Sequence, residues 1–244
     1  MRKEGSLLAI LGRGIQKTTP DGPWLPTEDL EVYGEDGAHR TIRVQADDEN
    51  PKCLVGGGEL NLRAGIELYK KLDQRVVVCA YGHRAEYLKK IGGPSESEVL
   101  STLFAAEVKK VIGVTPTVDV WLRTREVEGK SNTNTELKNI FELAVGLGLG
   151  GVTVATVSVH IPRVLLLAER HISSVSQFKN LELQFFSSEE VLLDSEPQEY
   201  WDERIRRMHG SKAHLRALHL EMNGVRAIID GTYGKIWSEA YQRS

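Results

Sequence analysis

The chain has 244 residues, of which 41% are hydrophobic and 27% are charged, and its formal net charge is −3. This balance predicts one large globular α/β domain and gives no indication of a nucleic-acid or anionic-membrane partner. The apolar run at residues 7–11 is too short for a signal-peptide core or a membrane span, so we expect a cytoplasmic protein without an integral membrane segment.

Short apolar runs alternate along the chain with segments of helical periodicity. The runs typical of strands are 6–11, 52–55, 75–80, 117–122, 151–157 and 181–186. Apolar residues at three- and four-residue intervals predict helices at 60–72, 96–112, 135–147 and 161–170. The alternation predicts a Rossmann-like, doubly wound and mainly parallel sheet, with helices on both faces, over residues 1–194.

Two stretches interrupt this pattern. Residues 17–50 contain three prolines and an acidic run, and we expect an inserted loop with a small hairpin near 30–44. Residues 195–244 carry two or three polar helices and no clear strand. We expect these helices to form an extension that packs on the domain or makes a homo-oligomer contact. Their basic residues are interleaved with acidic ones, which favours a solvated face over a polyanion contact.

Two cysteines, Cys53 and Cys79, lie in or beside apolar strand-like runs. This placement favours reduced, buried thiols over a disulfide or a catalytic thiol. Histidine and cysteine spacings of known metal sites are absent from the sequence, so no tight metal site is predicted.

The most informative segment is VTVATVSVHIPR, residues 152–163. Its β-branched run predicts a buried parallel strand, and Ser158 and His160 follow where that strand ends. Ligands of open α/β sheets bind at this edge, so we predict that His160 is catalytic and that Ser158 and Arg163 contact the ligand. The alternative interpretation is a histidine that only caps the next helix through its neighbours.

Two glycine-rich segments, at 12–14 and 56–58, lie at other predicted strand ends. Glycine permits close backbone approach, Arg13 suits a carboxylate or phosphate, and free N–H groups suit an anion or a ribose. Neither segment matches the GxGxxG or GxxxxGKS/T pattern, which disfavours a standard nicotinamide or P-loop site. The residues predicted to bind the ligand here are Gly12, Arg13, Gly14, Gly56, Gly57, Gly58, Glu59 and Asn61.

Further polar groups follow the third and fourth predicted strands. Glu96 stands beside the capping Ser95 without a capping role of its own. The segment 131–136 has more hydroxyls and amides than a helix cap needs, so it suits a polar ligand, although a multiply capped helix start is the alternative. These segments add Glu96 and Glu136 to the candidate catalytic residues. The further residues predicted to bind the ligand are His83, Ser131, Asn132, Thr133 and Thr135.

In order along the chain, the segments LGRG, RAGIELYKKL, SESEVL, SNTNTELKN and SVHIPR resemble the bacterial SanA/ElyC/YdcF-like family over about residues 5–190. The resemblance implies a Rossmann-like fold, and either Thr133 or Thr135 matches the family threonine. Many relatives carry an N-terminal membrane anchor, whereas this chain starts at its first strand, so an envelope role is not expected. The resemblance implies one pocket formed by Gly12, Glu96, Ser131, Thr133, Glu136, His160 and Arg163.

The family is linked to adenosylmethionine binding and to lipid-linked envelope precursors, without a settled reaction. Our leading hypothesis is an enzyme that hydrolyses a phosphoester or pyrophosphate in a nucleotide-like or phosphorylated small molecule. In it, His160 is the acid/base or nucleophile, and Glu96 or Glu136 orients the histidine. No dense carboxylate cluster for a divalent metal stands out in the sequence, though Glu96 with Glu136 could supply a loose one. The alternative is a module that binds an adenosylmethionine-type ligand without turnover.

Overall fold

The structure is a computed structural model, which describes residues 5–17, 22–27, 57–72, 74–82, 92–113, 118–119, 132–195, 197–210 and 212–233. The predicted strand at 52–55, the hairpin near 30–44 and Cys53 lie outside these residues. So do Gly56, His83 and Ser131 of the predicted site.

A five-stranded parallel sheet forms the centre of the molecule, and its strand order is β5-β4-β1-β6-β7. Numbered along the chain within this sheet, the order is 3-2-1-4-5, the arrangement of a Rossmann-like fold. The predicted fold class is therefore confirmed. The strands are β1 Ser6–Ile10, β4 Gln74–Cys79, β5 Val118–Asp119, β6 Gly151–Thr156 and β7 Glu182–Ser187.

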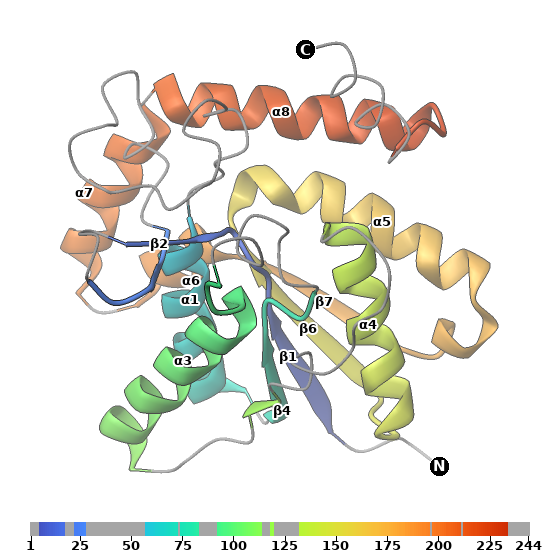
Figure 1. Ribbon diagram of the computed structural model, residues 1–244, viewed down its shortest axis with the longest axis horizontal. Helices are drawn as coiled ribbons and strands as arrows, with labels where there is room; N and C mark the ends of the chain where they lie inside the picture. Colours follow the sequence, from blue (N-terminus) through green and yellow to red (C-terminus); the bar gives the residue numbers. More distant parts are fainter. Residues whose placement is uncertain are drawn as a thin grey trace.

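Helices cover both faces of the sheet (Figure 1). On one face lie α1 (Gly58–Lys71) and α3 (Glu96–Ile112), and on the other lie α4 (Thr133–Gly146) and α5 (Ile161–Ser174). Side chains alternate across β1, so that Leu8 and Ile10 enter the core under α1 and α3 while Leu7 and Ala9 enter the core under α4 and α5. This double burial explains why the strand has an unbroken apolar sequence.

The helix ends follow local capping chemistry. The Ser95 side chain accepts the Glu98 N–H at the start of α3, as predicted, and Asn132 accepts the Thr135 N–H at the start of α4. Because Asn132 is the cap, α4 begins at Thr133, two residues earlier than its apolar periodicity indicates. Helix α5 continues four residues beyond its predicted end at residue 170.

The predicted inserted loop begins with regular structure. An antiparallel pair joins β2 (Ile15–Gln16) to β3 (Leu25–Pro26). Two-residue strands carry too little hydrophobic pattern to be recognised in a sequence. Their effect is to place Thr27, which follows β3, against the start of α1.

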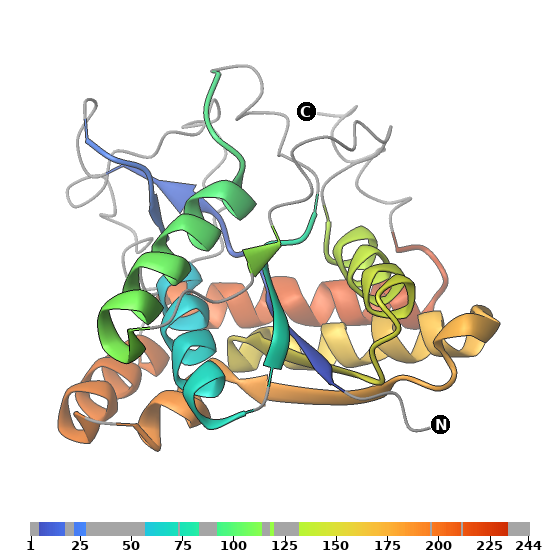
Figure 2. The ribbon, with the colours of Figure 1, turned by 90° about the horizontal axis from the view of Figure 1, so that it is seen from below.

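The chain after β7 consists of three helices in its described part: α6 (Ser188–Leu193), α7 (Gln198–His209) and α8 (Lys212–Ile229). Helix α8 runs beside α5 in both views and contacts the short 3-10 helix η4 (Ser158–His160), which follows β6 (Figures 1 and 2). The C-terminal segment therefore reaches the edge of the sheet where β6 ends. Among the described helices, none has the length and apolarity required to cross a membrane.

The thiol of Cys79 is unoxidised and fully buried at the end of β4. Burial raises its pKa to about 12, and a hydrogen bond with Ser101 only partly offsets this rise. A thiol that stays protonated is a poor nucleophile, so Cys79 contributes to packing, in agreement with the prediction for this residue.

Candidate active site

The candidate site lies where β1 and β6 end side by side. These neighbouring strands lead to helices on opposite faces of the sheet, and open α/β sheets bind their ligands at such a position. Residues 12–14 follow β1, and His160 ends η4 directly after β6. His160 therefore lies, as predicted, at the carboxyl end of a strand, which is where sheets of this topology bind their ligands.

Both ring nitrogens of His160 have partners, and the residue is only 2% exposed. Nδ1 lies 3.0 Å from Glu221 Oε2 and 3.1 Å from Arg163 Nη2, and Nε2 lies 3.3 Å from Thr133 Oγ1. Burial lowers the pKa of His160 to about 4, since the charges of Arg163 and Arg13 reinforce the effect of burial and Glu221 opposes it. His160 is therefore neutral at neutral pH. Nδ1 lies between the Glu221 carboxylate and an N–H donor of Arg163. We assign the ring proton to Nδ1, on the side of the carboxylate, and this leaves Nε2 to accept from Thr133.

Glu221 enters the site from α8 and joins three positively charged or basic groups. Its carboxylate lies 2.9 Å from Arg13 Nη1 and 2.7 Å from Arg163 Nε, in addition to its contact with His160. Although burial raises the pKa of Glu221, His160, Arg13 and Arg163 together hold it well below the usual range. The carboxylate is thus permanently ionised, and it orients the imidazole.

Glu96 and Glu136 hold the loop that follows β1. Glu96 Oε1 accepts the N–H groups of Arg13 at 2.6 Å and Gly14 at 2.5 Å, and Glu136 Oε1 accepts that of Gly12 at 3.2 Å. A Cβ atom on Gly12 would lie 2.8 Å from the Glu96 carboxyl group, so this contact requires glycine. Burial and the charge of Glu96 raise the pKa of Glu136 to about 8, and burial also raises that of Glu96.

These contacts correct two expectations. The carboxylate that orients His160 is Glu221, whereas Glu96 and Glu136 bind backbone amides. The N–H groups of Gly12, Arg13 and Gly14 are directed at those two carboxyl groups rather than left for a ligand. The described residues include no cluster of three or more histidine, cysteine or acidic side chains suited to a metal ion.

The second glycine segment also has a structural role. Gly57 caps α1 in the left-handed region at φ 102°, and the Gly58 N–H donates to Thr27 Oγ1 at 3.0 Å. Glu59 pairs with Arg204 at 2.7 Å. Asn61 is fully buried, and its Nδ2 donates to the Leu11 carbonyl at 2.8 Å. Gly58, Glu59 and Asn61 therefore use these atoms to hold α1 against neighbouring parts of the chain.

The remaining predicted ligand-binding residues fall into two groups. The Ser158 hydroxyl and N–H donate to Glu189 at 2.9 and 2.8 Å, and Thr135 donates to the capping Asn132. The Thr133 hydroxyl instead faces His160. Thr133 thus belongs to the site, whereas Thr135 belongs to the helix cap. Of the seven residues in the pocket implied by the resemblance, those brought together are Gly12, Glu96, Thr133, Glu136, His160 and Arg163.

Glu221 was not singled out from the sequence as a site residue. It lies on one face of α8 with Ala217, Gly224 and Ile228, at intervals of four, three and four residues. Ala217 and Ile228 belong to the packed core, and a Cβ atom on Gly224 would lie 2.8 Å from Arg163 Cδ. A carboxylate at an otherwise apolar helix position is the signal that could have indicated Glu221 as a site residue.

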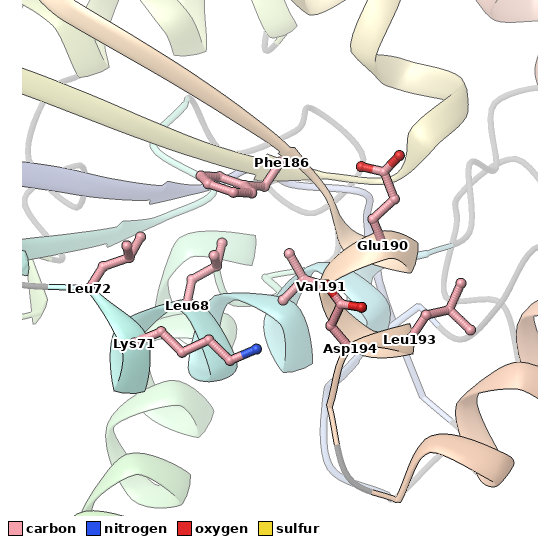
Figure 3. A pocket seen from close by; sticks show the side chains of 8 residues that line it. All are labelled: Leu68, Lys71, Leu72, Phe186, Glu190, Val191, Leu193 and Asp194. Atoms are coloured by element: carbon pink, nitrogen blue, oxygen red, sulfur yellow. The ribbon is translucent and has the colours of Figure 1, made fainter.

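A separate hollow lies away from this site, against α1, β7 and α6 (Figure 3). Its volume is about 560 Å³. Leu68, Phe186 and Val191 supply apolar lining, and Lys71, Glu190 and Asp194 supply charged groups. None of its lining residues is His160 or a residue that contacts His160.

Searches against protein-family models, curated proteins and solved structures find no match for this chain. The fold alone does not specify a reaction, so the chemistry of the site residues is what indicates the function.

Proposed function

We propose that the protein is a hydrolase of phosphate esters or anhydrides in a nucleotide-like or phosphorylated small molecule, with His160 as its acid/base group. The observation that carries this proposal is the fixed, neutral His160 where β1 and β6 end side by side. An imidazole whose Nδ1 is held by a carboxylate presents Nε2 as a proton acceptor, which is the arrangement that general-base catalysis requires.

Arg163 is the group beside His160 that suits an anionic substrate. Arg13 and Arg163 carry two positive charges, the carboxylates of Glu221 and Glu96 offset them, and His160 is neutral. The Arg163 side chain is 20% exposed, whereas that of Arg13 is 1% exposed. We therefore expect Arg163 to contact the phosphate directly, through donors that suit phosphate oxygens.

In the proposed reaction, Nε2 takes a proton from the attacking oxygen and gives it to the leaving oxygen. Glu221 stabilises the imidazolium that forms between these two transfers. The assembly of Gly12, Glu96, Thr133, Glu136, His160 and Arg163 also supports the proposed relation to the SanA/ElyC/YdcF-like family. Buried, reduced Cys79 supports a cytoplasmic location as part of this proposal.

The first test compares His160→Gln with His219→Gln, which changes an exposed histidine on α8. We expect the wild-type protein to hydrolyse bis(p-nitrophenyl) phosphate, p-nitrophenyl phosphate or ATP, with or without magnesium. We expect His160→Gln to lower kcat by a factor of about 100 or more, since general acid–base catalysis contributes on that order. His219→Gln should match the wild type.

Thermal-shift measurements with the same compounds and with adenosylmethionine complete this test. Equal turnover by His160→Gln and the wild type would overturn the role of His160. Absence of turnover, together with a thermal shift from adenosylmethionine alone, would favour a binding module over the hydrolase.

We also propose that α8 pairs with α8 of a second copy. Leu215, Leu218, Met222, Val225 and Ile229 follow one another at intervals of three, four, three and four residues, which is the spacing of a coiled-coil seam. All except Val225 are 40–70% exposed. The seam lies off the face that holds Glu221, so it is available to a partner while α8 packs on the domain.

Light scattering coupled to size-exclusion chromatography tests this contact. We expect a dimer for the wild type and a monomer for Met222→Glu, because a charge in the seam opposes its burial. The control is Leu165→Glu, which changes an exposed leucine on α5 and should leave the dimer intact. A monomeric wild type, or a Met222→Glu variant that stays dimeric, would contradict the proposal.

A further inference from the structure

We infer that Thr133 is the nucleophile of this site and that hydrolysis passes through a phosphothreonine. The inference deepens the proposed function and rests on it. Thr133 Oγ1 lies 3.3 Å from His160 Nε2, which in turn is oriented through Nδ1 by Glu221 at 3.0 Å. A hydroxyl, a base and an orienting carboxylate in this order form the arrangement by which proteins activate a weak alcohol nucleophile.

The position of Thr133 is not explained by helix capping. Asn132 supplies the cap of α4, through its contacts with the N–H and the hydroxyl of Thr135. Thr133 directs its hydroxyl away from that cap and toward the imidazole. The residue is 9% exposed, and the slightly long contact is typical of a catalytic hydrogen bond before the substrate binds.

The geometry favours Thr133 over His160 itself as the attacking group. Nδ1 of His160 faces Glu221 Oε2 at 3.0 Å and Arg163 Nη2 at 3.1 Å, so it is not directed toward a substrate. Nε2 is covered by the Thr133 hydroxyl. A phosphorus atom that bonded to Nε2 would have to displace the Thr133 hydroxyl, whereas Oγ1 needs no such displacement.

Two positive features lie near the reacting oxygen. Thr133 is the first residue of α4, where the positive end of the helix dipole favours negative charge. Arg163 extends from α5 to the same histidine. Both features favour the additional negative charge that develops on a phosphoryl group during its transfer.

The reaction has two balanced steps. In the first, Thr133 Oγ1 forms a bond to phosphorus, the bond from phosphorus to the leaving oxygen breaks, and the hydroxyl proton passes through His160 Nε2 to that oxygen. In the second, water attacks the phosphothreonine, the Oγ1–phosphorus bond breaks, and the water proton passes through Nε2 back to Oγ1. Water is the only co-reactant.

The test uses the full-length protein, bis(p-nitrophenyl) phosphate as probe and three variants. Thr133→Val removes the hydroxyl and keeps the shape, Thr133→Ser keeps a hydroxyl, and Thr102→Val removes an exposed hydroxyl on α3 as the control. We expect Thr133→Val to lower kcat by a factor of about 1,000 or more, as loss of a nucleophile does. Thr133→Ser should retain turnover, and Thr102→Val should match the wild type.

The covalent intermediate gives a second measurement. Acid quenching in the first turnovers, followed by intact mass and peptide mapping, should show one phosphoryl adduct on Thr133 in the wild type and none in Thr133→Val. Circular dichroism and the melting temperature of each variant confirm that it is folded.

The outcomes separate the two proposals. If His160→Gln loses turnover while folded Thr133→Val keeps wild-type kcat, the nucleophile is not Thr133 and the proposed hydrolase function stands. An adduct on another residue also overturns the inference. If neither His160→Gln nor Thr133→Val changes turnover, the proposed function fails as well.

Discussion

Replacement of Glu221 by alanine is expected to lower the free energy of unfolding by about 3–5 kcal/mol, as does removal of one partner from a buried ion pair. The reason is that Arg13 and Arg163 both pair with this carboxylate, and the Arg13 side chain is only 1% exposed. Without Glu221, a buried guanidinium loses the ionic partner that compensates its loss of solvation.

Urea denaturation at neutral pH measures this effect. Glu169→Ala is the matched control, because Glu169 is an exposed glutamate on α5, and its free energy of unfolding should stay within about 0.5 kcal/mol of the wild type. Glu221→Gln keeps the shape of the side chain, and we expect it to fold and to lose turnover. A Glu221→Ala variant as stable as Glu169→Ala would contradict the central position of this carboxylate.

The second large effect concerns the pH dependence of stability. The pKa of His160 is about 4 in the folded protein and near 6.5 in the unfolded chain. Between these values the unfolded state binds one proton more than the folded state, so the contribution of neutral His160 is complete above pH 6.5 and is lost as the pH falls to 4. At 1.36 kcal/mol for each pKa unit, the loss amounts to about 3 kcal/mol.

The comparison of wild type with His160→Gln isolates this contribution. Glu136, whose pKa is raised to about 8, lowers stability as the pH rises from 4.5 to 8, and it does so in both proteins. The difference in the free energy of unfolding between wild type and variant should therefore increase by about 3 kcal/mol from pH 4 to pH 6.5. A difference that stays constant with pH would show that His160 has an ordinary pKa.

Much of the fold could be predicted from the sequence because its signals are local. The unbroken apolar runs of β1 and β6 require burial on both faces, and this requirement predicts a parallel sheet. The position of His160 at the end of β6 then follows from the direction of the strand. Residues 12–14 and 160 lie together for the same reason, since parallel strands end at the same edge.

The partners of these residues could not be predicted, because they depend on contacts between distant parts of the chain. Glu221 lies 61 positions after His160, and nothing in the periodicity of α8 specifies which surface its apolar face covers. Likewise, the Thr27 hydroxyl accepts the Gly58 N–H at the start of α1 because the short β2–β3 pair brings it there. The sequence therefore indicated the histidine and both threonine candidates, while the choice of Thr133 required the packing of α4.

Burial holds His160 neutral, and Glu221 orients the ring with its proton on Nδ1 and with Nε2 directed at Thr133. Nitrogen NMR of protein labelled at histidine, assigned with His160→Gln, observes both ring nitrogens directly. We expect His160 to show the Nδ1–H tautomer at neutral pH and to take up a second proton only near pH 4. A proton on Nε2, or a titration near pH 6.5, would contradict the account.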